Sequence, residues 1–147
     1  MKKKESLEAI FRMASGIHIK TRRILENRLK SLKLTFPQSG VLISLLRNDA
    51  VSQKYLAESL DTDSTTIMVI CDALEKKGVI KRMKDPRDRR TNLICLTPLG
   101  KRIGADSTGL SMEYAERLAA SCSQRELESI LPVLRKLYEE IKRIEKQ

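Results

Sequence analysis

The segment from Gly78 to Gly100 places the tightest constraint on the fold of this chain. It holds two short runs of strand-forming residues, 79–83 and 92–96, separated by a turn-rich loop over residues 84–91 that carries three arginines. This arrangement predicts a β-hairpin with a basic tip. Thr97 and Pro98 follow in the order of a helix N-cap and a first-turn proline, so we expect a helix to begin directly after the hairpin.

Two short helices are predicted immediately before the hairpin. Ser52 and Asp63 are the candidate N-cap residues, and Gly78 stands where the second helix needs a left-handed residue to end. A helix pair of this kind is, by itself, as typical of a simple helical corner as of a DNA-reading unit. The basic hairpin attached to its second helix favours a winged helix-turn-helix. The apolar residues that the two helices would bury are Tyr55, Leu56, Leu60, Ile67, Ile70, Cys71 and Leu74.

Both ends of the chain predict long amphipathic helices. Residues 5–32 and 124–144 place apolar side chains at helical spacing, and Ser123 with Glu126 forms a capping box before the second stripe. These stripes carry more apolar surface than one small winged-helix core can cover, which predicts a dimer interface between intertwined terminal helices. A helical hairpin within a monomer is the alternative. Pro132 is expected to kink the last helix.

The predicted fold is therefore mainly α, within the α+β class. Residues 35–97 would form a winged helix-turn-helix lobe with a two-stranded wing, which would be the DNA-binding region. Residues 1–34 and 98–147 would form a helical dimerisation region. Within the lobe, Thr35 and Gln38 form a capping box that opens the first helix, which we expect to end near Asn48.

Basic residues are concentrated around the predicted hairpin. The chain of 147 residues has 29 Lys and Arg against 19 Asp and Glu, a net charge of +10. Residues 76–102 hold ten basic and two acidic side chains, whereas residues 34–75 hold two basic and six acidic ones. A basic block of this kind is typical of a surface that binds a polyanion, although a solubilising face would have the same charge. Its attachment to a helix pair favours duplex DNA, with the second helix in the major groove and the hairpin in the adjacent minor groove.

Other classes of function find little support in the sequence. The chain has no glycine-rich phosphate-binding motif, one histidine, and three cysteines without CxxC spacing, so we expect no enzyme, no metal site and no cofactor. No apolar run approaches the ~20 residues needed to cross a bilayer. Glu5, Glu8 and Arg12 interrupt what would be the apolar core of a signal peptide. We therefore expect a soluble, cytoplasmic protein with no membrane partner.

Three motifs give the chain a family resemblance. They are residues 74–82 (LEKKGVIKR), 85–90 (DPRDRR) and 96–100 (LTPLG). Their order and spacing resemble the MarR family of bacterial and archaeal transcription regulators, from about residue 5 to 145. The resemblance implies a homodimer in which two winged-helix lobes bind duplex DNA at a pseudo-palindromic operator, with half-site centres about 34–36 Å apart. It also implies a sequence-specific regulator, most simply a repressor that is released when a small, often aromatic, ligand enters a cleft beside each lobe.

The resemblance implies roles for individual residues. Arg89 matches the wing-tip arginine that enters the minor groove. Asp88 and Arg90 match an Asp-x-Arg pair whose salt bridge and hydrogen bonds hold the wing against the reading helix. Several other residues stand at helix N-termini that would face phosphates, and Lys77 is a further phosphate candidate. The predicted DNA contacts are Gln38, Ser52, Gln53, Lys54, Ser64, Thr65, Thr66, Met68, Val69, Arg87 and Arg89.

The reading helix departs from the family pattern at two positions. Met68 and Val69 stand where members commonly have Thr and Arg, which removes a candidate bidentate contact worth about 1–3 kcal/mol of discrimination. The two apolar side chains would instead pack on the methyl groups of thymine in an A/T-rich operator. The alternative is that specificity comes from the wing and from the shape of the DNA.

An effector cleft and a redox-active thiol are further expectations. By resemblance, the cleft would be lined by Met13, Ile17, His18, Leu42 and Leu46. Cys71 and Cys95 are expected to be small core residues, whereas Cys122 precedes a helix start, where a thiolate could be stabilised. Two alternatives to an operator-specific repressor stay open: a nonspecific architectural winged helix that binds DNA or RNA, and a regulator that senses oxidation through a thiol.

Overall fold

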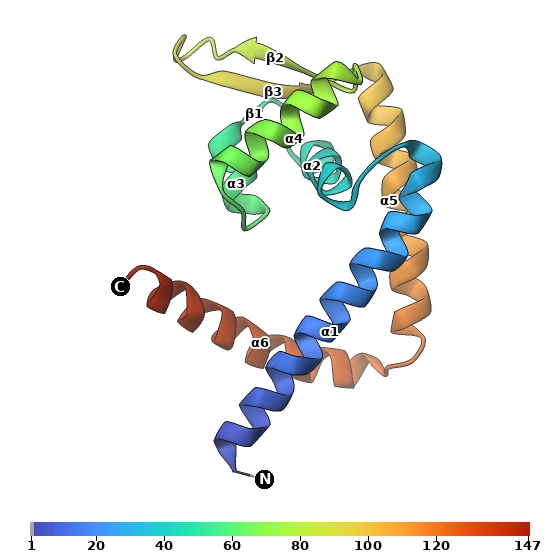
Figure 1. Ribbon diagram of the computed structural model, residues 1–147, viewed down its shortest axis with the longest axis vertical. Coiled ribbons are helices and arrows are strands. Elements are labelled where there is room, and N and C mark those ends of the chain that lie inside the picture. Colours follow the sequence, from blue (N-terminus) through green and yellow to red (C-terminus); the bar gives the residue numbers. More distant parts are fainter. Residues whose placement is uncertain (1) are drawn as a thin grey trace. The chain divides into compact units, whose positions relative to one another are not determined.

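The computed structural model describes residues 2–147 and confirms a mainly helical α+β fold with a winged helix-turn-helix (Figure 1). It has two compact units, one ending at Ser111 and the other running from Met112 to Gln147. The helices are α1 (Lys3–Leu29), the 3-10 turn η1 (Lys30–Leu32), α2 (Phe36–Arg47), α3 (Gln53–Ser59), α4 (Ser64–Lys76), α5 (Pro98–Ala119) and α6 (Gln124–Glu145). The strands are β1 (Val51–Ser52), β2 (Ile80–Lys84) and β3 (Asn92–Leu96).

Helix α2 is the centre of the hydrophobic core in the first unit. Its Val41, Leu42 and Leu45 have no exposed surface, and the helix contacts α1, α3, α4 and β3. Each fully buried Leu or Ile side chain contributes about 1.5–3 kcal/mol relative to an exposed one, so this shared core fixes the helix pair against the sheet. The large side chains that complete it from neighbouring elements are Leu29, Leu56, Ile67, Leu74, Ile80 and Ile94.

The predicted hairpin is present, but the sheet has a third strand. Strands β2 and β3 pair antiparallel from Ile80 opposite Leu96 to Lys84 opposite Asn92. Strand β1 pairs with the other edge of β3, with Val51 opposite Ile94, which gives the order β1-β3-β2. The predicted two-stranded wing is therefore extended at its base. Because β1 has only two residues, its pairing depends on the tertiary position of the helix-turn-helix rather than on a local sequence pattern.

Helix capping follows the sequence closely. Thr35 and Gln38 form the predicted capping box, and a second one joins Ser123 to Glu126. Ser52 caps α3 and Asp63 caps α4, each by accepting a backbone N–H three residues on. The predicted burial of Tyr55 is wrong, because its ring is 38% exposed and its hydroxyl accepts a hydrogen bond from the Asn48 side-chain amide at 2.8 Å. Leu60 and Ile70, also expected in the core, are half-buried.

A tight junction joins the end of α4, the sheet and the start of α5. Gly78 has a φ of 69°, the left-handed conformation that ends α4. The Val79 carbonyl then accepts the Thr97 N–H at 3.1 Å, while the Thr97 hydroxyl donates to the Gly78 carbonyl at 2.7 Å and accepts the Gly100 N–H at 3.0 Å. Gly100 lies so close to the Val79 carbonyl that an added Cβ would overlap the oxygen.

The second unit consists of the end of α5 and the whole of α6. None of the α6 residues is buried, and the helix is continuous through Pro132. Seven of its apolar side chains are between 37% and 61% exposed, and Leu137 is half-buried: the seven are Leu127, Ile130, Leu131, Leu134, Tyr138, Ile141 and Ile144. They fall at the predicted helical spacing, so α6 has one apolar face that is largely exposed.

The junction yields a prediction for stability. Gly100→Ala is expected to destabilise the protein by about 1–3 kcal/mol, because the new methyl group must displace the Val79 backbone. Gly109→Ala in the same helix is the matched control: nothing lies within 4 Å of its added Cβ. That change should be neutral or stabilising by about 0.5–1 kcal/mol. Urea unfolding followed by circular dichroism measures both, and equal unfolding free energies for the two variants would contradict the prediction.

Candidate nucleic-acid interface

Helix α4 presents one exposed stripe of side chains. Thr65, Met68, Val69 and Asp72 are exposed, with Met68 at 46% and Val69 at 61%. Their spacing of three and four residues places them on one face of the helix. The opposite face is buried through Ile67, Cys71 and Leu74, as predicted. We call the four exposed residues the α4 stripe.

The first turn of α4 is held by its N-cap. Asp63 Oδ1 accepts a hydrogen bond from the Thr66 backbone N–H, with 2.8 Å between nitrogen and oxygen. Asp63 Oδ2 accepts a second one from the Thr66 hydroxyl, with 2.6 Å between the two oxygens. Both hydrogen bonds hold the pKa of Asp63 below its ordinary value. The bond from the Thr66 hydroxyl has the larger effect, and the bond from the Thr66 backbone N–H has the smaller one. The capping interaction therefore stabilises the fold at neutral pH and is lost as the pH falls through the lowered pKa. The Thr66 hydroxyl is occupied in this contact, whereas Ser64 and Thr65 are exposed at the helix N-terminus.

An ion-pair cluster joins α4 to the base of the wing, and the sequence analysis missed it. The Arg82 guanidinium on β2 donates to Asp72 Oδ1 at 2.5 Å and to Glu75 Oε2, and the Arg82 backbone N–H donates to Glu75 Oε1 at 3.2 Å. The Arg82 side chain is only 21% exposed. The spacing of Asp72 and Glu75, one turn apart on α4, is a signal that could have indicated a shared basic partner.

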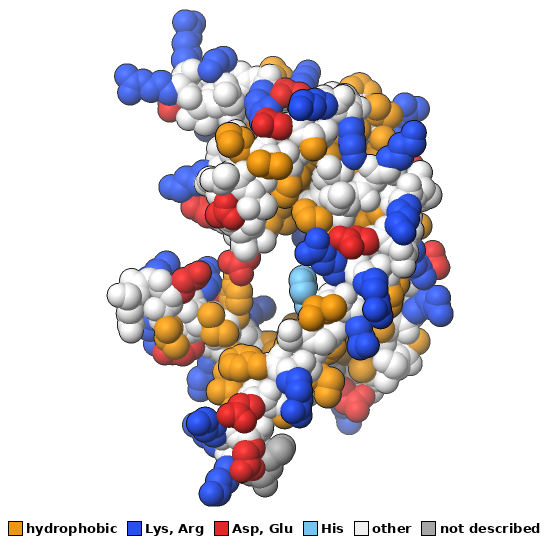
Figure 2. Space-filling view, in the orientation of Figure 1, with side chains coloured by type: hydrophobic (Ala, Val, Ile, Leu, Met, Phe, Trp, Pro, Cys, Tyr) orange, Lys and Arg blue, Asp and Glu red, His pale blue; other side chains and the backbone are white. Residues whose placement is uncertain are grey.

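The wing tip is basic and exposed. The Arg87 side chain is 90% exposed, with its Nε 3.7 Å from Asp85 Oδ1, and Arg89 is exposed as well. Figure 2 shows Lys and Arg side chains gathered at this end of the first unit. The tip is shaped by Asp85, whose carboxylate accepts the Arg87 N–H at 2.8 Å. The two arginines are therefore carried on an ordered turn with their charged ends in solvent.

The expected link between the wing and the reading helix through Asp88 and Arg90 is corrected by the structure. Asp88 accepts the Arg90 N–H at 3.0 Å and the Thr91 hydroxyl proton at 3.0 Å, so its contacts stay within the wing tip. Arg90 is exposed. The ion pairs between the wing and α4 are made by Arg82 instead, whose strand β2 contacts α4.

Gln38 and Lys77 also have other partners than those expected. Gln38 is only 8% exposed. Its Oε1 accepts two hydrogen bonds, one from the Thr35 backbone N–H at 3.2 Å and one from the Lys77 ammonium group at 2.8 Å. The same ammonium donates to the Lys33 carbonyl at 2.5 Å. These two side chains tie the end of α4 to the start of α2. As DNA contacts, both residues stay predictions.

The start of α3 carries three of the predicted contacts. Ser52 accepts the Tyr55 N–H at 3.1 Å, and its side chain is half-buried, as is that of Gln53. The Lys54 side chain is 84% exposed and lies 4.0 Å from the Glu58 carboxylate. A pair this exposed contributes at most a fraction of a kcal/mol, so the Lys54 ammonium can exchange Glu58 for another anion.

Only part of the predicted effector cleft is exposed. Met13 and Ile17 on α1 are 66% and 58% exposed, and Leu46 on α2 is 39% exposed. The His18 ring meets Phe36 edge to face, with 6.4 Å between ring centroids. Leu42, also predicted to line the cleft, is fully buried in the core and lies beside Gly104.

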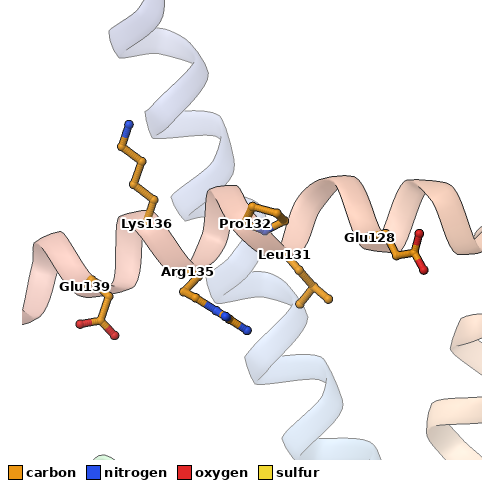
Figure 3. A pocket seen from close by; sticks show the side chains of 6 residues that line it. All are labelled: Glu128, Leu131, Pro132, Arg135, Lys136 and Glu139. Carbon is orange, nitrogen blue, oxygen red and sulfur yellow. The ribbon is translucent and has the colours of Figure 1, made fainter.

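A surface hollow lies on α6. It is lined by Glu128, Leu131, Pro132, Arg135, Lys136 and Glu139, all from this one helix (Figure 3).

Within residues 2–147, no group of three or more His, Cys, Asp or Glu side chains is placed to hold a metal ion. Nor does any helix in that range combine the length and the apolar character that a bilayer crossing requires.

The three thiols differ in their surroundings. Burial raises the pKa of Cys71 to about 11, and burial is also the largest cause that raises the pKa of Cys95. Cys122 is exposed in the connection between α5 and α6, with its sulfur 3.7 Å from the Ser121 hydroxyl. The core positions of Cys71 and Cys95 are as predicted.

These surroundings predict the reactivity of the thiols. The thiolate is the reactive form, so Cys71 and Cys95 should be inert near neutral pH while Cys122 reacts. Titration of the native protein with a disulfide reagent should therefore modify one thiol per chain, and titration in denaturant should modify three. Cys122→Ser should abolish the native reaction. Prompt reaction of a second thiol in the folded protein would contradict the assignment.

The exposed α4 stripe, the helix pair and the basic wing together define a winged helix-turn-helix protein. A sequence model of the MarR family matches residues 34–91. The HTH-type transcriptional regulator SarZ of Staphylococcus aureus is 30% identical over 109 residues, which cover 74% of this chain and 72% of SarZ. The chain belongs to the MarR family of transcriptional regulators.

Solved structures agree with this assignment. The transcriptional regulator BldR from Sulfolobus solfataricus has the same fold, with a TM-score of 0.84 and 22% identity over 95% of this chain and 99% of BldR. The S. aureus MepR–DNA complex has a TM-score of 0.80 and 25% identity, covering 90% of this chain and 96% of MepR. The relatives compared are transcription regulators rather than enzymes.

Proposed function

We propose that this protein regulates transcription by binding duplex DNA with the α4 stripe in the major groove and the wing in the adjacent minor groove. The observation that carries the proposal is the Arg82 cluster, which joins the exposed stripe of α4 to the base of the basic wing. A groove-reading helix and a minor-groove arm must keep a fixed separation to read neighbouring grooves of one duplex. The MepR–DNA complex, a structure similar to this chain, supports DNA as the partner.

The proposed contacts fall into two classes. Arg87, Arg89, Lys54 and the N-termini of α3 and α4 would contact phosphates or the minor groove, which gives affinity and register. Met68 and Val69 would contact base edges, where apolar side chains pack on thymine methyl groups. The proposed contact set is Ser52, Gln53, Lys54, Ser64, Thr65, Met68, Val69, Arg87 and Arg89, with Gln38, Thr66, Lys77, Asp88 and Arg90 as residues that shape the site.

The proposal includes a homodimer formed by residues 1–34 and 98–147. The support is the apolar face of α6, together with the exposed Ile10 and Phe11 on α1. Monomeric proteins rarely leave apolar faces of this length in water. A two-fold dimer would present two lobes to a pseudo-palindromic operator, with half-site centres about 34–36 Å apart.

The sign of regulation and the effector are further parts of the proposal. The family resemblance implies that the protein is a repressor, which a small ligand releases from DNA. The exposed side chains of Met13, Ile17 and Leu46 offer an apolar surface that such a ligand could bind. Cytoplasm is the proposed location, because a regulator of this kind acts where the chromosome lies.

Selection from a library of random duplexes tests the proposal directly. The full-length protein should enrich a pseudo-palindrome with A·T pairs at the positions that α4 contacts. Binding should weaken steeply with salt, since each phosphate contact releases a counterion. Enrichment of no sequence, with equal affinity for all duplexes or for RNA, would replace this proposal by the nonspecific architectural alternative.

The wing tip yields a prediction for affinity. Arg89→Ala should weaken binding to the selected duplex by about 1–3 kcal/mol and reduce the salt slope by about one, because one cation leaves the interface. Lys20→Ala, at an exposed position on α1, removes the same charge away from the wing and should leave binding unchanged. Fluorescence anisotropy at several salt concentrations measures both. Equal losses in the two variants would show that only net charge matters.

The α6 face yields a prediction for assembly. Leu134→Glu places a charge on the apolar face and should convert the dimer to a monomer in light scattering, with loss of operator binding. Ser129→Glu places the same side chain on the exposed polar side of α6 and should leave the dimer intact. A wild-type protein that is monomeric at micromolar concentration would overturn the dimer proposal.

A further inference from the structure

The α4 stripe contains an acidic side chain where a DNA-facing surface would be expected to exclude one. Asp72 follows Met68 and Val69 by one turn, and its side chain is 51% exposed. Glu75 lies a further turn along, 41% exposed. Two carboxylates beside a polyanion repel it, and α4 offers no basic residue between Ser64 and Glu75 to offset them. The proposed docking therefore needs something that compensates these charges.

Arg82 supplies that compensation. Its guanidinium lies between the two carboxylates, with one nitrogen donating to Asp72 Oδ1 at 2.5 Å and the other to Glu75 Oε2. The second Glu75 oxygen accepts the Arg82 backbone N–H at 3.2 Å. A planar guanidinium holds two carboxylates in fixed positions better than a lysine ammonium does. Because its side chain is 21% exposed, Arg82 is poorly placed to contact phosphate itself.

We infer that Arg82 is a positioning residue for DNA binding, which neutralises Asp72 and Glu75 and draws their carboxylates toward the base of the wing and away from the DNA. The inference rests on the proposed function. It differs from the alternative in which Asp72 reads a base by accepting a hydrogen bond from the cytosine amino group. It also differs from a role in which Arg82 binds phosphate directly.

The test uses the duplex selected by the full-length wild-type protein. Arg82→Gln should weaken binding about tenfold, the size expected when carboxylates near phosphates lose their counter-charge. In an Asp72→Asn, Glu75→Gln background, the same Arg82→Gln change should alter the dissociation constant less than about threefold, because no charge remains to be neutralised. Arg82→Lys keeps the charge and should retain most of the affinity. Urea unfolding of every variant separates lost affinity from lost folding.

Asp72→Asn alone keeps Arg82 and does not depend on the stability of the Arg82→Gln variant. It should bind the duplex as tightly as the wild type or more tightly. Asp106→Asn, at an exposed position of α5, is the matched control for removal of one negative charge. A loss of more than about threefold for Asp72→Asn, the size of a lost base contact, would overturn the inference in favour of base reading.

The remaining outcomes are also decisive. An equal loss from Arg82→Gln in both backgrounds would overturn the inference in favour of direct phosphate contact. No loss in either background would overturn it as well. Failure of the wild-type protein to enrich any duplex would instead remove the proposed function, and this inference with it.

Discussion

The Val79 carbonyl is the point at which the elements of the first unit are joined. It accepts the Thr97 N–H, which closes the open end of the hairpin, and it lies against Gly100 in the first turn of α5. The preceding residue, Gly78, ends α4 in a left-handed conformation and gives its carbonyl to the Thr97 hydroxyl. The end of α4, both hairpin strands and the start of α5 therefore meet within a few ångströms. A change in any one of these backbones would alter the direction of the wing relative to α4.

A second set of contacts fixes the same arrangement from the side. Lys77 reaches from the end of α4 to Gln38 and the Lys33 carbonyl, and Arg82 reaches from β2 to Asp72 and Glu75. Both are cations that the sequence places in the basic block of residues 76–102. Each holds α4, whereas Arg87, Arg89 and Arg90 are exposed at the wing tip. The basic block therefore supplies both cations that hold α4 in place and cations that remain at the surface.

Local sequence determined what could be predicted. The caps at Thr35, Ser52, Asp63 and Ser123 involve residues three apart, and apolar spacing identifies buried faces such as that of α4. Contacts between distant residues were not visible. Val51 of β1 pairs with Ile94 of β3, 43 positions away, and the Lys77 ammonium contacts Gln38, 39 positions away. Family resemblance likewise assigned the wing-to-helix link to Asp88 and Arg90, whereas the structure gives it to Arg82.

The exposed face of α6 links stability to the proposed activity. An isolated helix of this length is marginal in water, because most helical stability comes from packing of the apolar face. No residue of α6 is buried, so packing within its own unit contributes little to its stability. If that surface is a second copy of the chain, folding of α6 and pairing of the lobes become one concentration-dependent equilibrium.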